Sequence, residues 1–108
     1  MSDKESVLEE LRRRYRELAE NALDGSFTEA ERDGFDRQAS NLLYQERRYV
    51  QAQFNGKEKE LADIAAEVGK IEGEISKANE KMKKISDVLS NVALAIVLIG
   101  KALDKVLV

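Results

Sequence analysis

Apolar residues divide the chain into three stretches with helical spacing. In the first stretch they recur three or four positions apart, on one face of a helix: Val7, Leu8, Leu11, Tyr15, Leu18 and Ala22. This spacing predicts a helix over about residues 3–23. The pair Asp24-Gly25 that follows is typical of a turn.

The second stretch begins at Ser26, and Glu29 three residues later gives it the form of a capping box. Its end is marked by Asn55-Gly56, a pair that adopts positive φ at helix ends. The sequence therefore predicts a second helix over residues 26–54 and then a reversal of the chain. The apolar positions between these signals include Phe27, Ala30, Phe35, Ala39, Leu42, Leu43, Tyr49, Val50 and Phe54.

The third stretch carries a heptad repeat. Its a positions are Phe54, Leu61, Val68, Ile75, Met82, Leu89, Ile96 and Leu103, and its d positions are Lys57, Ile64, Ile71, Ala78, Ile85, Val92, Ile99 and Val106. Only Lys57 among them is not apolar, and an unbroken seam of this length is typical of one continuous helix. We expect that helix to span residues 57–108, in a single all-α domain of residues 1–108. The predicted fold is an antiparallel helical hairpin or a three-helix coiled-coil bundle with one very long C-terminal helix.

The lengths of these helices predict an uncovered tail. At 1.5 Å per residue the third helix would be about 78 Å long, against about 43 Å and about 32 Å for the other two. Residues 88–108 would then extend beyond their partners, although they are the most apolar stretch of the chain and residues 92–99 are hydrophobic on every face. A dimer of hairpins that forms a four-helix bundle would cover them. The predicted interface consists of Leu89, Val92, Ile96, Ile99, Leu103 and Val106 on the seam, with Leu94, Val97 and Leu98 on the outward side.

This pattern favours a non-enzymatic protein that oligomerises with itself or binds a helical partner protein. The alternative is a membrane-active helical protein, such as a small pore-former or its neutralising partner, that inserts residues 88–108. Only the segment from Val88 to Ile99 precedes Gly100-Lys101, and it contains Ser90 and Asn91. A membrane span needs about 20 apolar residues, so the sequence favours a protein partner over lipid.

Composition argues against catalysis. The chain has no histidine and no cysteine, which removes most nucleophile–base pairs and the common zinc sites. Its carboxylates fall on polar helix faces, and a glycine-rich phosphate loop is absent. We expect no enzyme activity, catalytic residue, metal, cofactor or small-molecule substrate.

The charge balance and the N-terminal residues limit which partners and which cellular locations we expect for this protein. The net charge of −3 comes from 18 basic and 21 acidic residues mixed along the chain, so we expect no nucleic-acid binding. The basic run Arg12-Arg13-Arg14 with Arg16 is interpreted as a solvated helix face. The first residues lack the apolar core of a signal peptide, which leaves two expectations: cytoplasmic residence, or export without a cleaved signal.

A less favoured alternative is a calcium-responsive helix–loop–helix. Counted from Glu20, the segment resembles an EF-hand loop, with Asp24 fifth, Gly25 sixth and Glu31 twelfth. The third position is Ala22, which offers no oxygen to an ion. An ordinary turn followed by a capped helix accounts for the same residues.

Three short motifs give residues 11–56 a resemblance to a known family. They are Arg16-Glu17-Leu18-Ala19, Leu23-Asp24-Gly25-Ser26 and Gln53-Phe54-Asn55-Gly56. With this spacing the segment resembles the N-terminal half of the flagellin D1 domain. The resemblance implies helical self-assembly into a filament, and it would place Arg14 and Leu18 at surface positions involved in innate-receptor recognition. The residue types themselves favour solvation for Arg14 and packing for Leu18.

Overall fold

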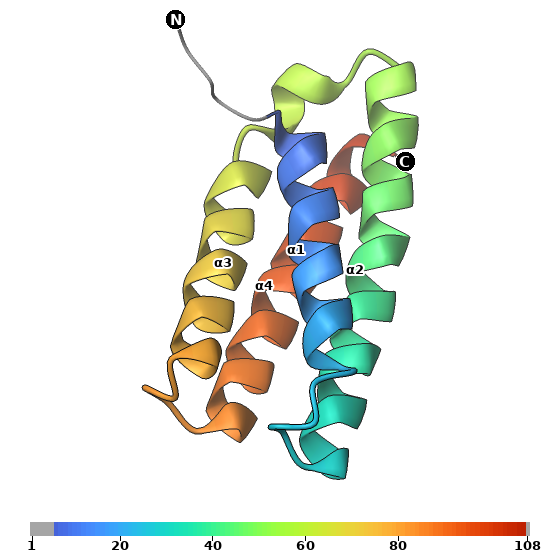
Figure 1. Cartoon of the computed structure of the whole chain (residues 1–108). Coiled ribbons are helices and arrows are strands. Elements are labelled where there is room, and N and C mark those ends of the chain that lie inside the picture. Colours follow the sequence, from blue (N-terminus) through green and yellow to red (C-terminus); the bar gives the residue numbers. More distant parts are fainter. Residues whose placement is uncertain (1–5, 108) are drawn as a thin grey trace, which may run out of the picture.

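The computed structural model describes residues 6–107, which form a bundle of helices (Figure 1). Helix α1 spans Val7–Asn21, α2 Glu29–Phe54, α3 Ile64–Asn79 and α4 Ile85–Val106. A short 3-10 helix, η1, spans Glu58–Leu61 between α2 and α3. No β-strand occurs within residues 6–107, and the predicted all-α class is confirmed.

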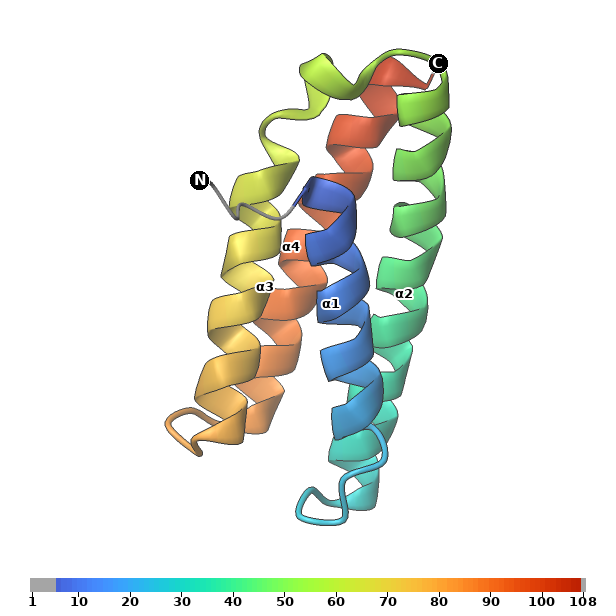
Figure 2. The same ribbon diagram turned by 45° about the horizontal axis from the view of Figure 1, so that its top comes forward.

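Two helical hairpins pack side by side. Helix α1 lies against α2 and α3 against α4, while α2 also packs on α4 and α1 on α3. Consecutive helices run in opposite directions, so α2 and α4 are parallel (Figures 1 and 2). Because α2 and α3 are diagonal neighbours, the segment with η1 crosses one end of the bundle (Figure 2).

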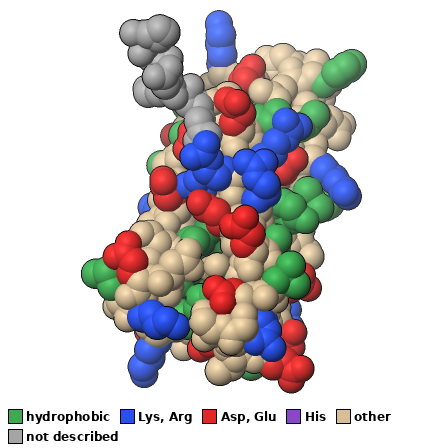
Figure 3. All heavy atoms as spheres, in the orientation of Figure 1, with side chains coloured by type: hydrophobic (Ala, Val, Ile, Leu, Met, Phe, Trp, Pro, Cys, Tyr) green, Lys and Arg blue, Asp and Glu red, His purple; other side chains and the backbone are tan. Residues whose placement is uncertain are grey.

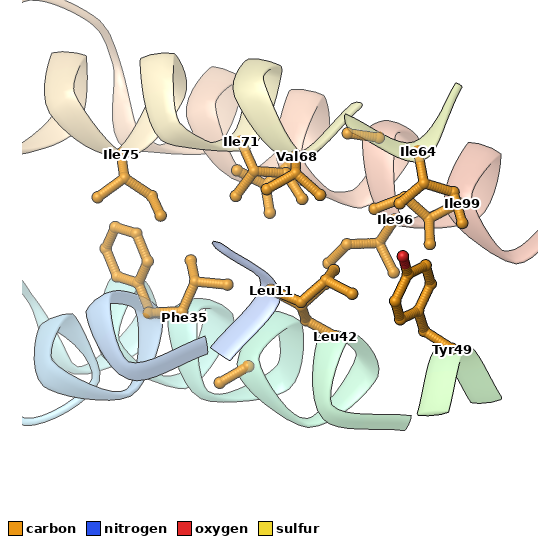
Figure 4. Packing of buried hydrophobic residues seen from close by; sticks show 14 of the residues in the cluster. Leu11, Phe35, Leu42, Tyr49, Ile64, Val68, Ile71, Ile75, Ile96 and Ile99 are labelled. Atoms are coloured by element: carbon orange, nitrogen blue, oxygen red, sulfur yellow. The ribbon is translucent and has the colours of Figure 1, made fainter. Parts of the chain in front are cut away.

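One core fills the space between the four helices. Along α3, Ile64, Val68, Ile71 and Ile75 point toward side chains of the other helices (Figure 4). Leu11 of α1 and Phe35, Leu42 and Tyr49 of α2 lie opposite them, while Ile96 and Ile99 of α4 lie near Ile64. Each of these side chains is at most 4% exposed, so the core-facing apolar residues of all four helices are buried within one chain.

Side-chain caps determine where the first two helices begin. Ser6 and Glu9 form a capping box at α1, and Thr28 and Glu31 form one at α2. The predicted cap at Ser26 is therefore wrong by two residues. The N–H of Ser26 instead donates to the Asp24 carboxylate at 2.9 Å, which holds this residue in the turn before the helix.

The end of α2 follows the prediction. The helix stops at Phe54, and Gly56 has a φ of 73°. The N–H of Lys57 donates to the carbonyl of Ala52 at 2.9 Å, the closing bond of a Schellman motif. Helix α2 thus ends at Asn55-Gly56, where the sequence predicted a helix stop and a reversal of the chain.

The predicted single helix over residues 57–108 is only partly correct. Most of the segment is helical, but η1 precedes α3, and a turn separates α3 from α4 between Asn79 and Ile85. Lys81 has a φ of 58° there, and the N–H of Met82 donates to the carbonyl of Lys77 at 2.8 Å. This is the motif that ends α2, with lysine in place of glycine.

This turn folds the heptad seam back on itself. The seam keeps its period on both sides, so α3 and α4 bury their apolar stripes against each other and against α1 and α2. The four-helix bundle expected from a dimer of hairpins therefore forms within one chain. Met82, an a position of the predicted seam, lies in the turn and is 69% exposed.

Candidate interaction surface

The inward side of α4 belongs to the core of its own chain. Val92, Ile99 and Leu103 are fully buried and Ile96 is 4% exposed, whereas Leu89 and Val106 are half-buried. These six residues were predicted to form an intermolecular surface, which stays a prediction; in this fold their side chains pack within one chain. The turn between α3 and α4 supplies the neighbours that a second chain was expected to provide.

The outward side of α4 keeps its apolar centre. Leu94 is 58% and Val97 51% exposed, and Leu98 is half-buried. At 100° per residue these side chains share one face of the helix with several exposed polar residues. We call this face the α4 stripe; it consists of Asp87, Ser90, Asn91, Leu94, Val97, Leu98, Lys101 and Lys105.

Opposite charges occupy the two ends of the α4 stripe. Asp87 lies in the first turn of α4, while Lys101 and Lys105 lie near its C-terminus. Each side-chain charge is opposite in sign to the partial charge of the helix end at which it lies, so the pairing is favourable. The sequence reasoning had singled out the apolar centre and missed these ends, although the spacing of Asp87 and Lys105 from Leu94 follows the same helical period.

A groove of about 470 Å³ borders the stripe on the side of α2. Tyr44, which is 61% exposed, lies beside Val97 in its lining. Arg48 forms an ion pair with Asp104 and stacks 5.9 Å from the Tyr44 ring centroid. The apolar centre of the stripe thus continues onto α2 and is bounded by a fixed ion pair.

A smaller hollow of about 170 Å³ borders the stripe on the side of α3, with Leu94 and Leu98 in its wall. Its floor holds Glu74, whose carboxylate accepts hydrogen bonds from Lys83 Nζ at 3.0 and 3.1 Å. Burial raises the pKa of Glu74, but the bonds from Lys83 and Asn91 outweigh it and hold the pKa below its ordinary value. Charged residues on this side are therefore fixed in place.

The contact between α1 and α3 is unusually polar. Arg14 is 3% exposed, and its guanidinium lies 3.0 Å from Glu17 and 3.1 Å from Glu72. Burial raises the pKa of Glu17, although Arg14 opposes the rise. Nearby, Asn21 Nδ2 donates to Asn79 Oδ1 at 2.9 Å.

These contacts bear on two sequence expectations. Arg14 and Leu18 are both buried, so neither is available as a receptor-facing surface position. The other arginines of the basic run are exposed, and Arg12 pairs with Glu46 at 3.3 Å. Basic and acidic side chains alternate over the face seen in Figure 3, as expected of a solvated surface.

The residues that resemble a calcium-binding loop form a turn and a helix cap. The Asp24 carboxylate accepts from Ser26, and the Glu31 carboxylate accepts from the N–H of Thr28 at 2.8 Å. Phe27 packs into the core 5.0 Å from the ring of Phe35. Across residues 6–107, no cluster of three acidic side chains is placed to hold a metal ion.

Helix α4 also has the length and composition of a membrane span. The helix has 22 residues, and an 18-residue window within it has a mean hydropathy of 1.7, with 33% of that window buried inside the bundle. The core helix of a water-soluble bundle has the same properties, so length and composition alone do not distinguish the two.

Comparisons with protein-family models, with curated proteins and with solved structures found no match to this chain. The resemblance of residues 11–56 to flagellin stays a prediction.

Proposed function

We propose that this protein is a non-enzymatic helical bundle that associates with a second copy of itself through the α4 stripe. The observation that supports it is the exposed apolar centre at Leu94 and Val97, with an acidic residue at one end and lysines at the other. Such a surface is complementary to its own copy when the two helices run in opposite directions.

A two-fold axis near residue 96 gives the best match. Leu94 of one copy then faces Leu98 of the other, and Asp87 faces Lys105, twice over by symmetry. The helix dipoles also oppose each other in this arrangement. Tyr44 lies at the edge of the interface, where an aromatic ring with a polar end is common.

The size of the surface predicts weak association. Full burial of a leucine or valine contributes about 1.5–3 kcal/mol, so covering the exposed half of such a side chain contributes about 1 kcal/mol. Three such residues from each copy, with Tyr44 added, give roughly 6–8 kcal/mol, whereas association itself costs at least about 4 kcal/mol. The difference, at most roughly 2–4 kcal/mol, corresponds to a dissociation constant of about 1 mM or weaker, so the chain should fold alone and dimerise only at millimolar concentration.

Analytical ultracentrifugation from about 0.1 mM to about 3 mM tests this range, chosen from the affinity scale. The wild-type mass should rise with concentration, and Leu94→Glu should stay monomeric because it places a carboxylate against Leu98 of the other copy, twice by symmetry. Leu23→Glu is the matched control, since Leu23 is 87% exposed in the turn between α1 and α2. A wild type that is monomeric at about 3 mM, or two variants that behave alike, would contradict the proposal.

A second candidate function is membrane insertion of α4, which its length and hydropathy favour. Insertion requires α4 to leave the bundle and expose the core residues of α2 and α3, such as Leu42 and Ile71. Flotation with liposomes separates the two functions: an inserting protein floats with the lipid, and a self-associating bundle stays in the soluble fraction.

A further inference from the structure

A cavity of about 540 Å³ lies at the end of the bundle opposite η1. It is enclosed by the turn between α1 and α2 and the turn between α3 and α4, which lie at the same end (Figures 1 and 2). Its apolar lining comes from Phe27, Ala30, Ile85 and Leu89. The volume falls in the range of about 300–1,000 Å³ that is typical of small-molecule sites, which are mostly apolar with a few polar groups.

The polar groups of this cavity are mainly lysines. Lys81, Lys83 and Lys84 line it, and the Lys83 ammonium is already paired with Glu74. Lys81 Nζ lies 5.4 Å from the centroid of the Phe27 ring, inside the cavity lining. Within the part of the chain that the structure describes, neither Lys81 nor Lys84 forms a close ion pair, although the charge of Lys81 helps to lower the pKa of the Asp24 carboxylate.

The lining also contains one carboxylate, Glu31, which forms no ion pair with these lysines among the described residues. The Glu31 carboxylate is held by the N–H of Thr28 as part of the α2 capping box. Lys81 in turn adopts a left-handed backbone conformation that glycine adopts more easily, as Gly56 does in the same motif after α2. The turn itself does not need a lysine at this position.

We propose that this cavity binds a single-chain amphiphile with an anionic headgroup, of the fatty-acid carboxylate class. The alkyl chain lies over Phe27, Ile85 and Leu89, and the carboxylate lies between Lys81 and Lys84. An amphiphile with a cationic headgroup is repelled by the same lysines. This site is separate from the α4 stripe, so binding does not depend on self-association.

Decanoate below its micelle concentration is the probe, and decyltrimethylammonium is the matched cation of equal chain length. Binding is followed by two-dimensional ¹H–¹⁵N NMR of the full chain. Decanoate should produce saturable shifts centred on the amides of Phe27, Ala30 and Leu89, and the cation should leave them unchanged.

Three variants test the residues. Lys81→Gly relieves the backbone conformation while it removes the ammonium, so it should fold at least as well and bind decanoate roughly three- to five-fold more weakly. Ala30→Glu adds a carboxylate in the first turn of α2, where acidic residues favour the helix, and should weaken binding about ten-fold or more. Lys59→Gln removes the same charge from η1 at the opposite end and should leave binding unchanged.

Three results would overturn the proposal. Equal binding of decanoate by Lys81→Gly and Lys59→Gln would show that Lys81 does not recognise the headgroup. Equal shifts with decanoate and the cation would show that the charge of the headgroup does not matter. The third is a protein that floats with vesicles of anionic phospholipid yet shows no shift with decanoate, because the lysines then contact a bilayer surface and the cavity holds no chain.

Discussion

Two positions of the heptad seam, Ile75 and Met82, are equivalent in sequence and differ in structure. Ile75 is 2% exposed in the core and Met82 is 69% exposed in the turn between α3 and α4. Ile75→Ala should lower the free energy of unfolding by about 2–5 kcal/mol, from lost transfer energy and the cavity left behind. Met82→Ala should lower it by less than about 0.5 kcal/mol, because it removes surface contacts only.

Urea denaturation followed by circular dichroism at 222 nm measures both changes. With a slope of about 1–3 kcal/mol per molar urea, Ile75→Ala should move the midpoint down by roughly 1–2 M, and Met82→Ala should leave it almost unchanged. Both variants should keep the helix signal of the wild type in the absence of urea. An equal loss of stability in Met82→Ala and Ile75→Ala would contradict the assignment of Met82 to an exposed turn.

Three further predictions concern charged residues. Asp87→Lys should abolish dimerisation in the ultracentrifuge, and the double variant with Lys105→Asp should restore it; a double variant that stays monomeric argues against the antiparallel arrangement. Arg14→Met should lower the midpoint of urea denaturation by about 1 M or more, because loss of the buried guanidinium leaves the partly buried Glu17 carboxylate without its compensating charge; an unchanged midpoint would show that the pair does not stabilise the fold. Since the pKa of Glu74 is lowered in the folded chain, its stabilising effect is present above pH 4.5 and is lost as pH falls through the lower folded-state pKa. Glu74→Gln should therefore unfold more easily than the wild type at pH 7 and similarly at pH 3, and an equal difference at both would refute this.

Periodicity and turn chemistry predicted much of the fold. The spacing of apolar residues located α1 and α2 to within a few residues, and the Asn55-Gly56 pair located the end of α2. The cap of α2 was misplaced because Ser26 and Thr28 each have an acidic residue three positions later, and only the use of Asp24 by Ser26 decides between them.

The turn after α3 was missed because its residues carry no helix-stopping signal. Lys81 takes the left-handed position that Gly56 takes after α2, and neither proline nor glycine lies between Asn79 and Ile85. The apolar period also continues through the turn, so pattern alone favours one helix. The contacts that α3 and α4 gain with each other and with the first hairpin favour the reversal, and those contacts are not visible in local sequence.

The outward side of α4 was predicted in part. Leu94, Val97 and Leu98 were predicted to face outward; Leu94 and Val97 are exposed, and Leu98 is half-buried. The seam residues beside them were also expected to meet another chain, because a straight helix leaves them bare. Once the chain reverses, other helices of the same chain cover them.

The turn between α3 and α4 has one more consequence. Because the seam stays in register across it, straightening residues 80–84 would join α3 and α4 into a single rod without moving any core side chain to the wrong face. Helix α4 of one molecule would then find, in a second molecule, the same neighbours that it has here. A domain-swapped dimer would thus have the same core as the monomer, and only five residues would determine which of the two forms.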